Sequence, residues 1–148
     1  MTVKNERQAE RLAKIVATLE ERFTDGRGRA VVETWINEAC QYRTPDGNAC
    51  AVGVLLSDNW YREHNFEYNY EGTGVEGIPL PKSLYPFVNL LSWAQGIHDD
   101  ASNWTKTTGK LNAEALKHFR SVTSKLIEST RVNGLDAALN EVGLGVCR

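Results

Sequence analysis

The sequence contains no run of about eighteen apolar residues, the length that a membrane-spanning helix requires. Residues 1–7 are polar and do not provide the apolar core of a secretory signal peptide. These two absences lead us to expect a cytoplasmic protein with no membrane partner. The net charge of −2 lacks the basic excess of proteins that bind duplex nucleic acid, so we expect no duplex partner either.

Several catalytic signatures are also missing. Neither the G-x-S-x-G elbow of hydrolases nor the G-x-x-x-x-G-K-[ST] phosphate loop occurs. Gly72, Gly74 and Gly77 imitate a dinucleotide-binding fingerprint, but no strand–helix–strand unit surrounds them. These absences favour a protein that has no catalytic residue and needs no cofactor.

The stretch 40–56, CQYRTPDGNACAVGVLL, combines more informative residue types than any other part of the chain. Its centre, Pro45-Asp46-Gly47-Asn48, is typical of a turn, because Pro fixes φ and Gly accepts a positive φ. The flanks 41–43 and 49–52 are expected to pair across this turn as a small hairpin, and the apolar run that follows should enter a core. We expect Gly53 at a point where a side chain would clash with a packed neighbour.

The three cysteines are an odd number, which favours reduced thiols in a chain without a signal sequence. Cys40 and Cys50 are expected to lie close together at the open end of the hairpin. They are interpreted either as small buried hydrophobic residues or as two ligands of a metal. Because the gap between them is not a zinc-knuckle spacing, we predict no metal site.

Apolar residues recur with helical spacing in several segments. The spacing predicts an N-terminal helix over 4–24, a helix over 82–97 and C-terminal helices within 112–142, the first of them capped by Asn112. Segment 30–39 also has helical spacing, although its β-branched residues leave a strand as the alternative.

These elements predict the class of fold. We expect a single α+β domain over residues 1–148, mainly helical, with a small antiparallel sheet around a hairpin at 40–52.

A set of short motifs is spread over residues 38–104. In chain order they are Cys40-x-Tyr42-Arg43, Gly47-x-x-Cys50-Ala51-Val52-Gly53, Asp58-x-x-Tyr61, Glu71-Gly72 and Gln95-x-Ile97-His98-Asp99. This pattern resembles a widespread group of small phage and prophage proteins. Proteins of this kind include viral sponges, which sequester the cyclic-nucleotide signals of bacterial anti-phage immunity of the CBASS type. The resemblance implies an oligomeric, non-catalytic binder in the cytoplasm of the host cell.

The residue types of the motif region also suit a small nucleotide, including a cyclic dinucleotide or oligonucleotide. Aromatic side chains can stack on the bases, and cationic side chains can hold phosphate. We place the site where Tyr42 and Arg43 meet the His98-Asp99 end of the 82–97 helix, beneath an aromatic loop over 60–72. The predicted ligand-binding residues are Tyr42, Arg43, Trp60, Tyr61, Glu71, Trp93, His98, Asp99 and Trp104.

Each of these residues also has a purely structural interpretation. The tryptophans suit a hydrophobic core, and Arg43 suits an ion pair with a neighbouring carboxylate. His98 and Asp99 suit a hydrogen-bonded pair at the end of a helix.

Two rival functions remain open at this stage. An HD-type metal-dependent phosphohydrolase has a His, then a His-Asp pair, then a distant Asp, and His64, His98-Asp99 and Asp136 occur here in that order. The other rival is a protein–protein inhibitor of a host enzyme, which would use the exposed aromatic loop as its contact surface.

Overall fold

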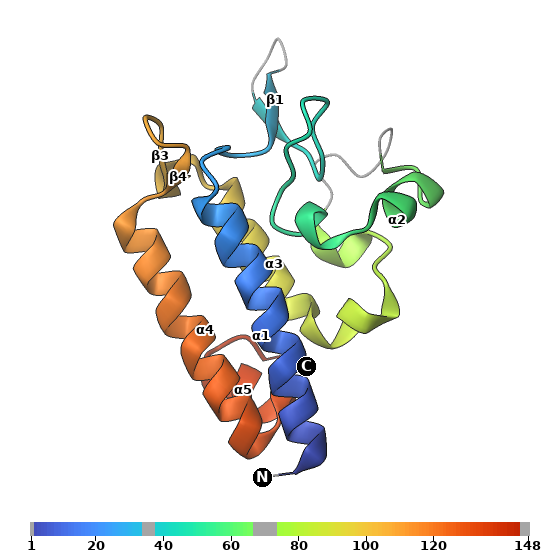
Figure 1. Ribbon diagram of the computed structural model, residues 1–148, viewed down its shortest axis with the longest axis vertical. Helices are drawn as coiled ribbons and strands as arrows, with labels where there is room; N and C mark the ends of the chain where they lie inside the picture. The colour runs from blue at the N-terminus through green and yellow to red at the C-terminus, as the bar shows by residue number, and fades with distance from the viewer. Residues whose placement is uncertain (1, 34–37, 67–73, 146–148) are drawn as a thin grey trace.

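The computed structural model describes residues 2–33, 38–66 and 74–145. Helix α1 (Val3–Thr24) packs along α4 (Ala113–Asn133), and the short α5 (Leu135–Glu141) packs on α4 (Figure 1). Helix α3 (Val88–Asp99) contributes to the same core. The described residues also form two small antiparallel sheets, so the predicted mainly helical α+β class is confirmed.

The long helices begin and end where capping residues occur in the sequence. The Thr2 hydroxyl accepts a hydrogen bond from the Asn5 N–H at 3.1 Å and starts α1. Asn112 caps α4 as predicted, because its Oδ1 accepts from the Ala115 N–H at 2.8 Å. Gly134, at φ +88°, separates α4 from α5. None of the described helices is both long and apolar enough to cross a membrane.

The helix predicted over 82–97 is present, but it begins as a 3₁₀ helix. Residues Lys82–Phe87 form η4, and the regular α-helix α3 follows from Val88. Pro86 lies inside η4 and has no N–H to donate, which disfavours regular α-helical bonding in this first part.

The described part of segment 30–39 contains strands at 31–33 and 38–39 and no helix, so the strand alternative is correct there and the helical interpretation is wrong. Strand β1 (Val31–Glu33) pairs antiparallel with β2 (Glu38–Cys40), with Val31 opposite Cys40. The β-branched valines favour this extended backbone. Residues 34–37, including Trp35, lie outside the described part of the chain. A second pair, β3 (Trp104–Thr105) and β4 (Lys110–Leu111), precedes α4.

The predicted hairpin follows β2 directly. One bridge pair joins Arg43 and Ala49, and the Cys50 N–H donates to the Tyr42 carbonyl at 3.1 Å. Gly47 has φ +88° in the turn, as predicted. The hairpin therefore lies next to the β1–β2 sheet in the chain. The regular strand pairing is between β1 and β2, and the hairpin itself adds one bridge pair.

Beyond the hairpin the chain passes very close to its own first arm. A Cβ at Gly53 would lie 1.8 Å from the Tyr42 carbonyl oxygen, so only glycine fits, as predicted. The next residues form the 3₁₀ helix η1 (Gly53–Leu55). Ser57 then caps α2 (Asp58–Glu63), because its Oγ accepts from the Trp60 N–H at 3.1 Å.

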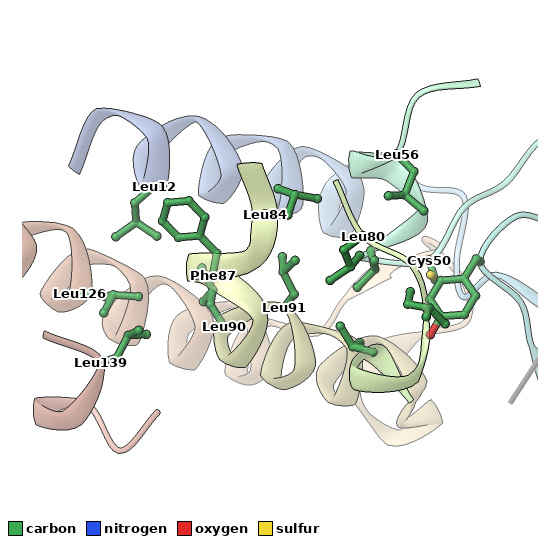
Figure 2. Close-up of a cluster of buried hydrophobic side chains, with 14 of the residues drawn as sticks. Leu12, Cys50, Leu56, Leu80, Leu84, Phe87, Leu90, Leu91, Leu126 and Leu139 are labelled. Carbon is green, nitrogen blue, oxygen red and sulfur yellow. The ribbon is translucent and has the colours of Figure 1, made fainter. Parts of the chain in front are cut away.

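The apolar run after the turn enters the core, as predicted, although Val54 and Leu55 are only partly buried. Ala51, Val52 and Leu56 are all in the core. Figure 2 shows that this core extends from Cys50 and Leu56 to the helices, where its labelled members are Leu12, Leu84, Phe87, Leu90, Leu91, Leu126 and Leu139. The hairpin is thus packed against the helices, which places the motif residues beside α1 and α3.

Candidate functional site

Arg22, in the last turn of α1, joins this helix to the hairpin. Its side chain is only 2% exposed. Its Nε donates to the Ala49 carbonyl, Nη2 donates to the Gly28 carbonyl at 2.5 Å, and Nη1 pairs with Asp25 at 3.3 Å. Burial lowers the pKa of the guanidinium, while the Asp25 charge opposes this shift. Arg22 was not among the predicted site residues, although its position three residues after Leu19 on the apolar stripe was a usable signal.

His98, near the end of α3, is completely buried and uses both ring nitrogens within the protein. Nε2 accepts a hydrogen bond from the Ala30 N–H at 3.0 Å, and Nδ1 lies 2.9 Å from Asp99 Oδ1. Since Nε2 is an acceptor, Nδ1 carries the proton and donates it to Asp99. Burial lowers the pKa of His98, and the hydrogen bond to Asp99 acts in the opposite direction. This geometry matches the structural interpretation of the His98-Asp99 pair.

Gln95 extends the same network to the hairpin. Its Nε2 donates to Asp99 Oδ1 at 2.7 Å, and its Oε1 accepts from the Val52 N–H at 3.2 Å. The Gln95 side chain therefore provides a hydrogen-bond acceptor for the buried Val52 N–H, which lies beyond the paired part of the hairpin. Gln95 belongs to the sequence motif but was not among the predicted site residues; its role depends on a partner 43 positions away.

Trp104 covers the other side of His98. Its indole N–H donates to the His98 carbonyl at 2.9 Å, and its ring meets the imidazole edge-on at 5.7 Å between centroids. The Arg22 guanidinium lies 5.7 Å from the centre of the Trp104 ring. Trp104 thus connects Arg22 with His98.

Arg43, in the first arm of the hairpin, contacts residues of α2. Its Nη1 pairs with the Asp58 carboxylate, and its Nη2 donates to the Leu56 carbonyl at 2.5 Å. The guanidinium carbon lies 4.9 Å from the centre of the Tyr61 ring. The Arg43 side chain is 25% exposed and that of Asp58 is 81% exposed, so solvent reaches this ion pair.

An aromatic cluster of Tyr42, Tyr61 and Phe66 supports Arg43. Tyr61 stacks on Phe66 with centroids 5.4 Å apart and an interplanar angle of 20°. Tyr42 meets Phe66 edge-on at 5.7 Å. Burial raises the pKa of the Tyr42 hydroxyl above its ordinary value.

Trp60 and Trp93, two further predicted site residues, pack against other side chains than those around Arg43 and His98. Trp60 stacks on His64 at 3.8 Å, and its indole N–H donates to the Pro79 carbonyl at 3.1 Å. Trp93 stacks on Phe119 of α4 at 5.7 Å, with an interplanar angle of 9°. Glu71 lies outside the described residues.

The thiol of Cys50 is 1% exposed, and burial raises its pKa to about 12. Such a thiol is neutral at physiological pH and packs as a small hydrophobic side chain. The prediction that Cys40 lies close to Cys50 is not tested, because the Cys40 side chain lies outside the described part of the structure.

The HD-type order of ligands is not gathered into a metal centre. The His64 Nδ1 lies 3.0 Å from the Trp60 carbonyl, and both nitrogens of His98 are occupied. Within residues 2–33, 38–66 and 74–145, no group of three or more His, Cys, Asp or Glu side chains is arranged to hold a metal ion.

Comparison of the chain with protein-family models, with curated proteins and with solved structures found no match.

Proposed function

We propose that this chain is a non-catalytic binding protein for a small nucleotide, with phosphate held by Arg43 and a base stacked on the neighbouring aromatic residues. The observation that carries the proposal is the position of the Arg43 guanidinium, 4.9 Å over Tyr61 and paired with a carboxylate that is 81% exposed.

This arrangement allows phosphate to replace Asp58 at little cost. An ion pair with an exposed carboxylate contributes only about 0–1 kcal/mol, because water competes with both partners. Charge-assisted hydrogen bonds from a guanidinium to phosphate are stronger and directional. The Leu56 carbonyl and the Tyr61 ring keep Arg43 in place while its outer partner is exchanged.

The chemistry of the neighbouring groups supports binding without turnover. His98 is buried in its neutral form with both nitrogens occupied, and Cys50 has a raised pKa. A general base needs a nitrogen within reach of the ligand, and a nucleophilic cysteine needs a lowered pKa. Neither residue meets its requirement.

The motif resemblance supports a wider form of the proposal. In this form the protein is phage-encoded, acts in the host cytoplasm as a homo-oligomer, and sequesters a cyclic dinucleotide or oligonucleotide signal of host defence. The resemblance alone supports the oligomer and the biological setting.

Calorimetric titration with cyclic dinucleotides and cyclic AMP tests the site. We expect Arg43→Ala to weaken binding at least about tenfold, because a charged hydrogen bond contributes roughly 1.5–3 kcal/mol. Asp58→Asn should bind as tightly as the wild type or more tightly, since it removes the competing carboxylate. Arg62→Ala is the matched control, because Arg62 lies on α2 and its Nη2 donates to the Asn59 side chain at 2.7 Å.

Three outcomes would contradict the proposal. The first is wild-type affinity in Arg43→Ala, and the second is binding by no member of the panel. The third is recovery of a hydrolysed nucleotide after incubation, which would identify the protein as an enzyme.

A further inference from the structure

Two pockets adjoin along α3, away from Arg43, and both are lined by Glu76. The first has a volume of about 430 Å³ and is bordered by Asn89, Ser92 and Trp93 of α3 and by residues 143–145. The second has a volume of about 370 Å³. Volumes of this order suit small ligands.

The second pocket is largely apolar. Besides Glu76, its walls include Ile78, Leu80, Val88 and Tyr85. Tyr85 is 56% exposed and is one of the few large hydrophobic side chains so accessible in the described chain. An alkyl group placed here would be removed from water against these side chains, which is favourable in proportion to the buried apolar area.

The first pocket offers two polar groups that face solvent, because Glu76 is exposed and Trp93 is half-buried. Within the described residues, neither the Glu76 carboxylate nor the Trp93 indole N–H has a hydrogen-bond or ion-pair partner in the protein. Asn89 donates its Nδ2 to the Leu144 carbonyl at 3.1 Å, which holds the C-terminal wall in place. Trp93 is fixed by its stacking on Phe119, so its ring is already ordered before a ligand arrives.

The charge of the two pockets selects the ligand. Among the described residues that line them, Glu76 is the charged one. A carboxylate beside an indole attracts a cation through a charge-assisted hydrogen bond and a cation–π contact. The same carboxylate repels phosphate, so this site differs in ligand from the one proposed at Arg43.

We propose that the two pockets together form a binding site for a ligand that carries a primary ammonium or guanidinium group next to an apolar group. The cation pairs with Glu76 beside Trp93, and the apolar group enters the pocket at Tyr85. Either a free amine or a lysine or arginine side chain with an apolar neighbour presents this chemistry.

The test is a ¹H–¹⁵N NMR titration of the full chain with hexylamine, hexanol and hexanoate. These probes share a six-carbon chain and differ in the charge of the head group. Hexylamine is expected to shift the Trp93 indole signal and the amides of 143–145, and to bind roughly tenfold tighter than hexanol, as one charge-assisted bond predicts. Hexanoate is expected to bind more weakly than hexanol.

Two variants locate the halves of the site. Glu76→Gln should lower the affinity for hexylamine roughly tenfold and leave the affinity for hexanol unchanged. Tyr85→Ala should lower the affinity for both probes to a similar extent. Glu10→Gln, at an exposed position on α1, is the control and should change nothing. Arg43→Ala should also leave hexylamine binding intact, which separates this site from the nucleotide proposal.

A second arm uses N-acetyl-Leu-Lys-methylamide to distinguish the sources. Tighter binding of the peptide than of hexylamine indicates a protein segment, and the reverse order indicates a free amine. The proposal is overturned if hexanoate binds as well as hexylamine, if Glu76→Gln leaves hexylamine binding unchanged, or if neither cation shifts the Trp93 indole.

Discussion

His98 accepts a hydrogen bond from the main-chain N–H of Ala30 at 3.0 Å, across 68 positions of sequence. The contact holds the entry to β1 against the end of α3, and Asp99 fixes the tautomer that makes it possible. A proton on Nε2 would abolish this acceptor and place a charge in the core. The stability of the protein should therefore depend on the protonation of His98.

We expect the free energy of unfolding to fall as the pH is lowered below about 6.5, the ordinary pKa of histidine. Below this value His98 is protonated in the unfolded chain but stays neutral in the folded chain, because burial lowers its pKa in the folded state. The loss should be up to about 1.4 kcal/mol per pH unit until the folded pKa is reached, and no such effect is expected at higher pH. Urea unfolding between pH 8 and 5 measures this slope. The control His118→Gln changes an exposed histidine and should keep the same dependence of stability on pH. If His98→Gln also kept it, the dependence would not come from His98.

Gly53→Ala should destabilise the protein more than Gly47→Ala. The Gly47 variant meets no atom within 4 Å but strains a positive φ, at a cost of roughly 1 kcal/mol. The Gly53 variant would force its methyl group into the Tyr42 carbonyl and separate the arms of the hairpin. We expect a loss of about 3 kcal/mol or more from this overlap. Equal denaturation midpoints of the two variants would show that the hairpin backbone shifts at little cost to make room for a methyl group at position 53.

Arg22→Met should lower the free energy of unfolding by about 2–4 kcal/mol, because it leaves the partly buried Ala49 carbonyl without its donor and the Gly28 carbonyl with the Asn48 side-chain amide alone. Arg120→Met is the matched control. Arg120 pairs with Glu20 at 2.7 Å, but its side chain is 56% exposed. Exposed pairs contribute little, so the control should change the stability by less than about 1 kcal/mol. Similar losses in both variants would mean that burial of Arg22 has no energetic role.

The thiol of Cys50 should resist alkylation in the native protein. Its raised pKa and its burial both reduce the concentration of reactive thiolate. In a Cys40→Ser, Cys147→Ser background, iodoacetamide at pH 8 should label Cys50 only after denaturant is added, as mass spectrometry would show. Rapid labelling of the folded protein would contradict the packing described here.

The helices were the predictable part of the fold, for reasons that particular residues show. The apolar stripe of α1 and the Asn112 cap of α4 are local signals, readable within a few positions. Segment 30–39 was ambiguous because its apolar residues fit a helical period while its valines favour strands. The two ends of the segment pair with each other as β1 and β2, and helical spacing alone gives no sign of this pairing.

The sequence could suggest the residue types of the candidate site but not the partner of each side chain. That Tyr42 meets the end of α3 stays a prediction. The sequence could not show that Arg43 would face Asp58, or that His98 would face Ala30. A residue type defines what a side chain can donate or accept, whereas the fold chooses its partner.

The hairpin at 42–50 has a single bridge pair and is held by side chains that come from helices. Isolated hairpins are marginal in water, so this one depends on α1 and α3 being in place first. The hairpin should therefore be unformed at the folding transition state. Substitutions at Arg22 and Gln95 would then accelerate unfolding and leave the folding rate almost unchanged. The lifetime of the native state would in this way be set by the contacts that form last.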